Sequence, residues 1–149
     1  MSTLTAPSKA AATAQLLTEN WLRNVFPSDM YTVRGRAAGD EGEHVPAVVV
    51  TRHRAPEGEP PLLVVEVSDA PMSEEMTEAA GRHAAAGVRD YWVIEVGARQ
   101  LHVFRSPRPD ADAKHGYIYQ QVRANSQFAL VAPLAAEIHL AQVCNLLPW

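Results

Sequence analysis

The pattern of apolar and polar positions is most informative between Pro60 and Glu95. Two short apolar runs, residues 62–67 and 91–96, stand on either side of a polar, alanine-rich spacer of helical length. Because neighbouring parallel strands need a connection of about a dozen residues or more, this spacing predicts a strand, a crossover helix and a second strand. The run at 62–67 lacks a two-residue alternation, so we expect both faces of its strand to be covered.

The remaining pattern predicts elements on both sides of this unit. A first helix is expected at 10–26 with Ser8 as its N-cap, and the spacer should form a helix at 73–86 that ends at Gly87. A short helix is expected within 138–147. Runs rich in β-branched and aromatic residues predict four further strands, the last at a sheet edge, at residues 30–36, 45–51, 100–105 and 117–122.

Composition indicates one soluble globular domain over residues 1–149, with residues 1–7 as a loose tail. An apolar fraction of 47% and a charged fraction of 20% are ordinary for such a domain. No apolar run approaches the roughly 18 residues of a membrane span, and the N-terminal residues lack a signal peptide's apolar stretch. We therefore expect a cytoplasmic protein. The single cysteine, Cys144, excludes an internal disulfide and a cysteine-based zinc cluster, and its apolar neighbours favour a buried thiol.

One acidic side chain interrupts the apolar run at 62–67. Glu66 loses hydration in a strand that is covered on both faces, so it must find a hydrogen-bonding partner, a proton or a metal ion. Two interpretations stay open at this point. Glu66 is either a buried carboxylate bound to a backbone amide or an arginine, or the remnant of a metal site.

Two segments resemble a known family. Residues 62–68 (LLVVEVS), followed after the spacer by residues 86–94 (AGVRDYWVI), are similar to a large bacterial family of restriction-endonuclease-like domains. Lesser similarities are Pro46 before an apolar strand and Gly116 before a late strand. The resemblance implies the fold of PD-(D/E)XK nucleases, an α/β fold with a mixed central sheet flanked by helices.

The resemblance also implies three catalytic positions, and only one of them is filled. Family members carry an aspartate after the proline on the second strand, a glutamate in the third strand and a lysine on the following helix. Two carboxylates of this kind hold Mg²⁺ beside the scissile phosphate, and the ammonium group positions the attacking water. In this chain the aspartate position is Ala47, the lysine position is Ala79, and Glu66 alone remains; His83 stands where a tyrosine is common.

These losses leave more than one functional hypothesis. The first is a catalytically degenerate nuclease that acts as a binding or dimerisation module, with no cofactor. The alternative is an active Mg²⁺-dependent endonuclease in which Glu75 and Arg82 act as relocated groups beside Glu66. A third hypothesis is a purely structural homodimer subunit.

The sequence says less about the binding partners of the protein. We expect a homodimer and no membrane association. The net charge of −4 does not favour DNA binding. One compact basic cluster is a candidate for binding phosphates and comprises Arg52, His53 and Arg54. Such a cluster is usually a solvated strand end.

Overall fold

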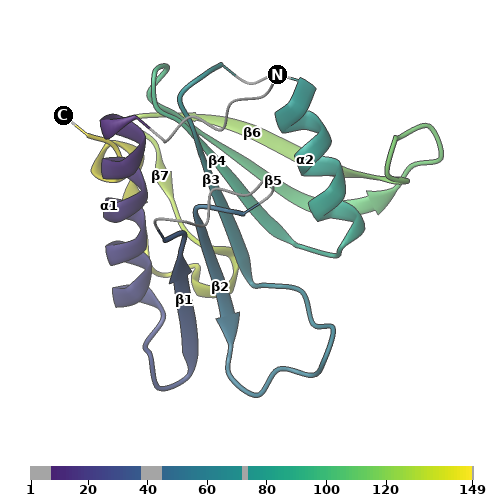
Figure 1. The fold of residues 1–149 in the computed structure, drawn as a ribbon, viewed down its shortest axis with the longest axis horizontal. Helices are drawn as coiled ribbons and strands as arrows, with labels where there is room; N and C mark the ends of the chain where they lie inside the picture. The colour runs from purple at the N-terminus through teal and green to yellow at the C-terminus, as the bar shows by residue number, and fades with distance from the viewer. Residues whose placement is uncertain (1–7, 38–44, 72–73, 149) are drawn as a thin grey trace.

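The computed structural model describes residues 8–37, 45–71 and 74–148, with the side chains of Glu74 and Glu75 excepted. Its first half contains helix α1 (Lys9–Val25), strands β1 (Tyr31–Gly35), β2 (Val48–Arg52) and β3 (Leu63–Ser68), and helix α2 (Glu74–Ala85). Its second half contains strands β4 (Asp90–Glu95), β5 (Gln100–Pro109) and β6 (Tyr117–Ser126), followed by β7 (Leu130–Val131), β8 (Ala141–Gln142) and the short 3-10 helices η1 (Leu134–Ala136) and η2 (Val143–Leu146). The sheet runs between α1 and α2 (Figure 1).

Strands β1 to β6 form one sheet in sequence order. Only β3 and β4 are parallel, and α2 connects them, which confirms the predicted strand–helix–strand unit. The other neighbours are antiparallel, so the sheet is mixed. Gly87 follows α2 with a φ of 85°, a conformation that favours glycine at a helix C-terminus.

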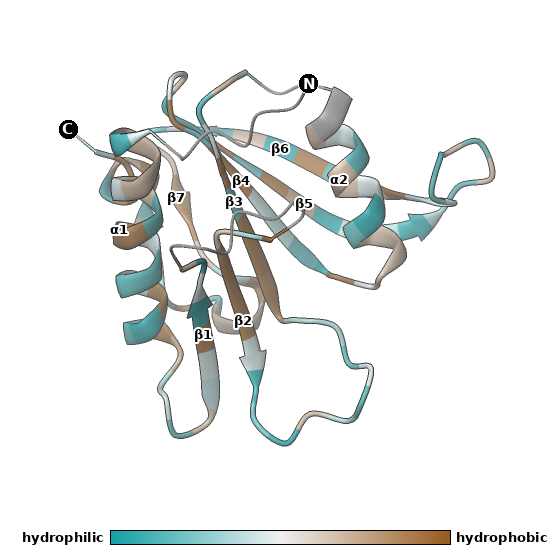
Figure 2. Cartoon of the chain, in the orientation of Figure 1, coloured by the Kyte–Doolittle hydropathy of each residue, from teal (hydrophilic) through white to brown (hydrophobic). Residues whose placement is uncertain are grey.

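The two faces of the sheet pack against different helices. Adjacent residues of a strand point to opposite faces, and Trp92 and Tyr91 divide in this way. Trp92 lies in the core beside α1, where it stacks on Trp21 with ring centroids 6.1 Å apart. Tyr91 lies in a second core together with Ala80 and Ala84 of α2. Much of β2 and β3 is accordingly hydrophobic (Figure 2), although β2 becomes hydrophilic at its end, where Thr51 and Arg52 lie.

The N-terminal helix begins as predicted. The Ser8 hydroxyl accepts a hydrogen bond from the Ala11 amide at 3.0 Å, which caps α1. Ser8 also contacts the Asp69 carboxylate through its hydroxyl and its amide, which ties the start of α1 to the end of β3. The N-cap expected of Ser73 and the tail expected at 1–7 lie outside the described residues.

The C-terminal segment differs from the prediction of a helix within 138–147. Residues 141–142 form β8 against β7, and only 143–146 make a 3-10 turn. The amides of Val143 and Cys144 donate to the carbonyls of Ala129 and Gln127, so these donors are used across the segment rather than along a helix. Cys144 is half-buried. Strands β5 and β6 also extend beyond their predicted ends, because their pairing continues to Pro109 and Tyr117 in one direction and to Gln100 and Ser126 in the other.

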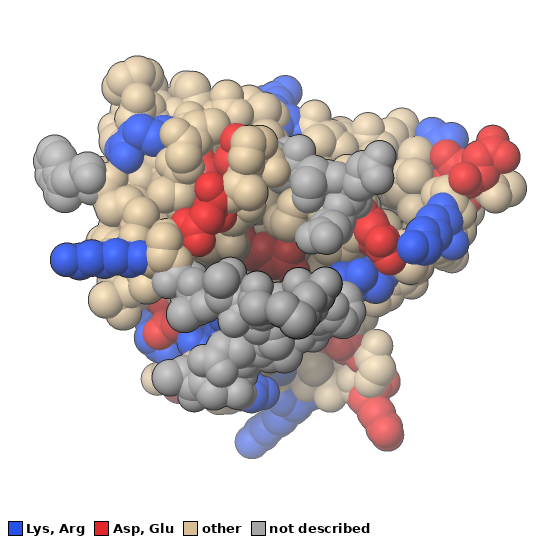
Figure 3. Space-filling view, turned by 45° about the horizontal axis from the view of Figure 1, so that its top comes forward, with Lys and Arg blue, Asp and Glu red and all other residues tan. Residues whose placement is uncertain are grey.

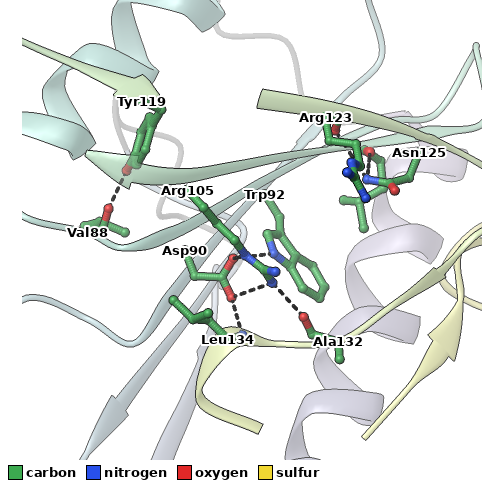
Figure 4. Close-up of polar contacts among 10 residues, drawn as sticks. Val88, Asp90, Trp92, Arg105, Tyr119, Arg123, Asn125, Ala132 and Leu134 are labelled. Atoms are coloured by element: carbon green, nitrogen blue, oxygen red, sulfur yellow. Dashed lines mark hydrogen bonds and ion pairs between the residues drawn. The ribbon is translucent and has the colours of Figure 1, made fainter. Parts of the chain in front are cut away.

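A buried carboxylate fastens this segment to the sheet (Figure 4). Asp90, with no exposed surface, accepts hydrogen bonds from the Trp92 indole at 2.7 Å, the Arg105 guanidinium at 3.0 Å and the Leu134 amide at 2.8 Å. Arg105 also donates to the Ala132 carbonyl at 2.7 Å. Burial raises the pKa of Asp90, while the Arg105 and Leu134 donors act against that shift. Among the described residues, no helix is long and apolar enough to cross a membrane.

Candidate functional site

Glu66 lies in β3, paired with Val93 of β4, on the face that α2 covers. Its side chain keeps 17% of its surface exposed. The Tyr91 hydroxyl donates to Glu66 Oε2 at 2.7 Å, and His83 Nε2 lies 3.6 Å from Glu66 Oε1. The carboxylate therefore contacts a phenol and an imidazole. The sequence had suggested a backbone amide or an arginine instead.

Three elements bring these side chains together. Val64 pairs with Tyr91 and Glu66 pairs with Val93, so Tyr91 is a diagonal neighbour of Glu66 on the same face of the sheet. His83 comes from the last turn of α2, and its ring lies 4.6 Å from the Tyr91 ring. The His83 and Tyr91 side chains therefore converge on one carboxylate.

The electrostatics of the site favour an ionised Glu66. Burial raises its pKa, but the His83 and Tyr91 donors and the charges of His83 and Arg82 outweigh burial, and the net effect lowers the pKa below 4.5. Burial and the nearby Glu66 charge raise the pKa of Tyr91, so its hydroxyl stays protonated. Glu66 is thus a carboxylate with a neutral donor on one oxygen.

The two positions that the resemblance marks as lost are closed by packing. Ala47 immediately precedes β2, whose Val48 pairs with Val65, and it is 2% exposed within the core beside α1. Ala79 of α2 is 5% exposed. Within the described residues, no three His, Cys, Asp or Glu side chains are arranged to hold a metal ion. Since Mg²⁺ requires several oxygen ligands, the donor set at Glu66 does not fit it.

Of the two candidate relocated groups, Glu75 and Arg82, the structure describes the side chain of Arg82. Glu75 stands in the first turn of α2, but its side chain lies outside the described part of the chain. Arg82 has its Nη1 atom 3.9 Å from Glu78 Oε1, and its charge helps to lower the pKa of Glu66. Arg82 is therefore near enough to act on the carboxylate, and its contribution is electrostatic.

The basic cluster is remote from Glu66. It begins at Arg52, the last residue of β2, and at about 3.3 Å per residue Arg52 stands about 13 Å along the strand from Val48, which pairs with Val65 beside Glu66. The Arg52 guanidinium forms a two-pronged ion pair with Glu59, with contacts of 2.7 to 3.1 Å, and His53 Nε2 lies 3.0 Å from the Thr32 hydroxyl. Arg54 is exposed in the turn that follows, with a φ of 57°. Two members of the cluster thus already have protein partners.

A second acid–imidazole pair was missed from the sequence. His102 Nε2 lies 2.9 Å from Glu95 Oε1, and both side chains are nearly buried. Glu95 is two residues beyond Val93, so it shares the sheet face of Glu66. The β4–β5 hairpin register, which pairs Val93 with His102, was the signal available. In the face shown in Figure 3, acidic side chains lie on the floor of a recess with basic ones near its rim, and no broad basic surface is present.

Comparison with known families identifies the chain. A family model described as "Uma2: Putative restriction endonuclease" matches residues 2–142. The chain belongs to the Uma2 family. Among solved structures, this Uma2 protein is similar to the crystal structure of a "putative nuclease belonging to DUF820" from Anabaena variabilis, with a TM-score of 0.68 and 14% sequence identity. The match covers 95% of this chain and 82% of that chain, whereas no curated protein matches.

These comparisons confirm the restriction-endonuclease-like family and the α/β fold predicted for the Uma2 chain. At 14% identity, the structural likeness concerns the fold alone. Function depends on the groups present at the site, because one fold supports many activities.

Proposed function

We propose that this Uma2 protein is a catalytically degenerate restriction-endonuclease-like domain that acts as a binding or dimerisation module. The observation that carries the proposal is the state of the three family positions. Glu66 is held by Tyr91 and His83, while Ala47 and Ala79 present only buried methyl groups.

The chemistry of phosphodiester cleavage explains why these losses matter. Without a carboxylate at Ala47, a divalent cation loses a charged ligand, and its affinity falls. Without an ammonium group at Ala79, the attacking water loses its positioning group and the developing phosphorane charge loses a counter-charge. Each loss should reduce the rate by on the order of a hundredfold or more, and catalytic groups that act as a unit fail together.

A second candidate function is an active endonuclease with relocated groups, which would use Mg²⁺. Arg82 favours it, because its positive charge acts on Glu66 from the helix that carries the lysine in the family. Glu75 would have to supply the missing carboxylate in that case.

A plasmid-nicking assay in Mg²⁺ and in Mn²⁺ separates the two candidates. The proteins to compare are the wild type, Glu66→Gln and the double variant Ala47→Asp with Ala79→Lys, each first shown to be folded by circular dichroism. We expect no cleavage by the wild type. Cleavage gained only by the double variant would support the degenerate site. Robust wild-type cleavage that Glu66→Gln abolishes would overturn it and favour the relocated groups.

A binding experiment then distinguishes a nucleic-acid module from a purely structural one. Retention on duplex DNA that weakens steeply as salt is raised indicates phosphate contacts. The basic cluster provides the variant: Arg54→Glu should reduce such retention, whereas Glu57→Gln, in the same exposed loop, serves as the matched control. Retention absent at low salt would leave protein–protein association as the function of the module.

A further inference from the structure

Strand β6 is an unprotected sheet edge. It has ten residues, all of them exposed except Tyr119 and Asn125, and no strand within the described residues pairs with its outer side. Alternate amides and carbonyls along such an edge point outward and can accept a further strand. Natural edges are usually blunted by proline, by several charges or by shortness. In β6 there is no proline or glycine, and Arg123 is its only charged residue.

The opposite edge of the sheet provides an internal comparison. Strand β1 has five residues, includes Arg34 and Gly35, and packs against α1. Its shortness protects β1, with five residues against ten in β6, whereas a single arginine and a packed helix are common to both edges. The two edge strands therefore differ in length, and β6 offers the longer backbone edge to a partner.

A groove of about 600 Å³ runs beside β6 on the face toward the C-terminal segment. Its floor includes Val103 and Arg105, and Arg105 and Arg123 project from neighbouring strands (Figure 4). Val122 on the β6 side and Leu130 on the β7 side are 57% and 62% exposed. Further large apolar residues of the C-terminal segment are well exposed, among them Phe128, Ile138 and Leu140. Such a density of exposed apolar side chains marks an interaction surface.

We propose that β6 and this groove form the interface with a second copy of the chain, in which the two β6 strands pair antiparallel across a two-fold axis. This inference rests on the proposed function, because it specifies the partner of the dimerisation module. An antiparallel pair of identical strands is compatible with a two-fold axis, and the resulting contact is closed and self-complementary. The pairing would join two six-stranded sheets into one.

The charges of the groove favour a second copy as the occupant. Arg123 and Glu137 both line it, and neither forms an ion pair within the described part of the chain. The proposed contact pairs Arg123 of each copy with Glu137 of the other, and two-fold symmetry makes the two ion pairs identical. One groove thus supplies both halves of two identical ion pairs.

The exposed apolar area supplies part of the area that a stable dimer interface buries. At about 25 cal/mol per Å² and 1.5–3 kcal/mol per fully buried side chain, each such side chain offers on the order of 60–120 Å². The five exposed apolar side chains named above, which are 57–88% exposed, therefore offer roughly 200–400 Å² in each copy. A stable interface buries about 800 Å² per partner, and the backbone edge and polar rim of β6 would supply the remainder.

The test is the concentration dependence of the mass, measured by sedimentation velocity for the wild type, Arg123→Glu, Glu137→Arg, the double charge swap and Leu130→Lys. The matched control is Leu16→Lys, because Leu16 is 55% exposed on α1, away from β6. We expect a wild-type dimer of twice 16.3 kDa. Each single charge reversal should raise the dissociation constant about tenfold, the charge swap should restore it to within about threefold, and Leu130→Lys should raise it at least tenfold. Leu16→Lys should change nothing.

Amide hydrogen exchange gives a second measurement that does not depend on variants. Amides of residues 117–126 should be better protected at high protein concentration than at low, whereas those of 31–35 should not change. A wild type that stays monomeric at every concentration, or a dimer that is indifferent to Arg123→Glu and Leu130→Lys, overturns the interface. These results are separate from the nicking assay: an inactive monomer would contradict the interface and leave the degenerate site standing, and an active dimer would do the reverse.

Discussion

Replacing Tyr91 by phenylalanine removes the hydroxyl that Glu66 accepts from and keeps the ring in its core. Tyr91 has no exposed surface, and its ring packs on Phe104 and Tyr119 with centroids 5.3 and 6.2 Å away. The substitution therefore tests one interaction, the 2.7 Å hydrogen bond to a carboxylate. A hydrogen bond to a charged group contributes about 1.5–3 kcal/mol, so we expect a loss of that size in the free energy of unfolding near neutral pH. For a domain of this length, such a loss lowers Tm by roughly 3–10 °C.

The loss should depend on pH, and the direction follows from the Glu66 pKa. Glu66 has a folded pKa below its ordinary value of 4.5, so its contribution to stability is present above that value and disappears as the pH falls through the folded pKa. Removing the Tyr91 donor raises the folded pKa, since burial then acts with less opposition. The variant thus loses the contribution at neutral pH. In acid, Glu66 is protonated in both proteins, and their stabilities should converge.

The assay is urea unfolding of the wild type, Tyr91→Phe and Tyr119→Phe at pH values from about 7 to about 3. Tyr119 is the matched control, because its hydroxyl donates at 2.7 Å to the neutral Val88 carbonyl. Tyr119→Phe should cost about 0.5–1.5 kcal/mol, by an amount that changes little over this range. A Tyr91→Phe loss that is equally large in acid, or one below about 0.5 kcal/mol at neutral pH, would refute a charge-assisted bond as the support of Glu66.

Two other substitutions test the packing that surrounds the site. Trp92→Ala should cost about 3–5 kcal/mol in urea unfolding, because Trp92 is fully buried and stacks on Trp21, and a loss below about 1 kcal/mol would contradict its core role. Asp90→Asn should cost about 3–5 kcal/mol because Arg105 loses its ionic partner, with Glu59→Gln, which removes one partner of a surface ion pair to Arg52, as a control that changes the unfolding midpoint little. An unaffected midpoint in Asp90→Asn would mean that the C-terminal segment is held by its apolar contacts alone.

The central unit of the fold could be predicted because its signals are local. An unbroken apolar run, a spacer of helical length and the glycine that ends α2 predict β3, α2 and β4 without knowledge of any distant contact. The segment after β6 could not be predicted in the same way. Its backbone pairs residue 143 with residue 129 and residue 144 with residue 127, and these pairings leave no periodic pattern in the sequence.

The site shows the same division between local and distant information. That Glu66 sits in a covered strand follows from its apolar neighbours. That its donor is Tyr91 follows only from the register of two parallel strands, which brings together residues 25 positions apart. The Glu95–His102 pair depends on the register of a hairpin in the same way. The alternation of side chains along a strand predicts that Tyr91 and Trp92 lie on opposite faces of the sheet. The register between strands determines which side chains each of them contacts.

The partners of Glu66 also change how its substitution must be interpreted. In an active nuclease this carboxylate would be needed for metal binding, but here it also accepts the buried Tyr91 hydroxyl and lies beside His83. Glu66→Ala would leave the hydroxyl without an acceptor, and an unsatisfied buried donor costs about 1–3 kcal/mol. A loss of any function in that variant would therefore mix instability with chemistry. Glu66→Gln keeps an acceptor oxygen and removes the charge, so a folded but inactive Gln variant would point to the carboxylate as a reacting group, and an unchanged one would point to a carboxylate whose function is structural.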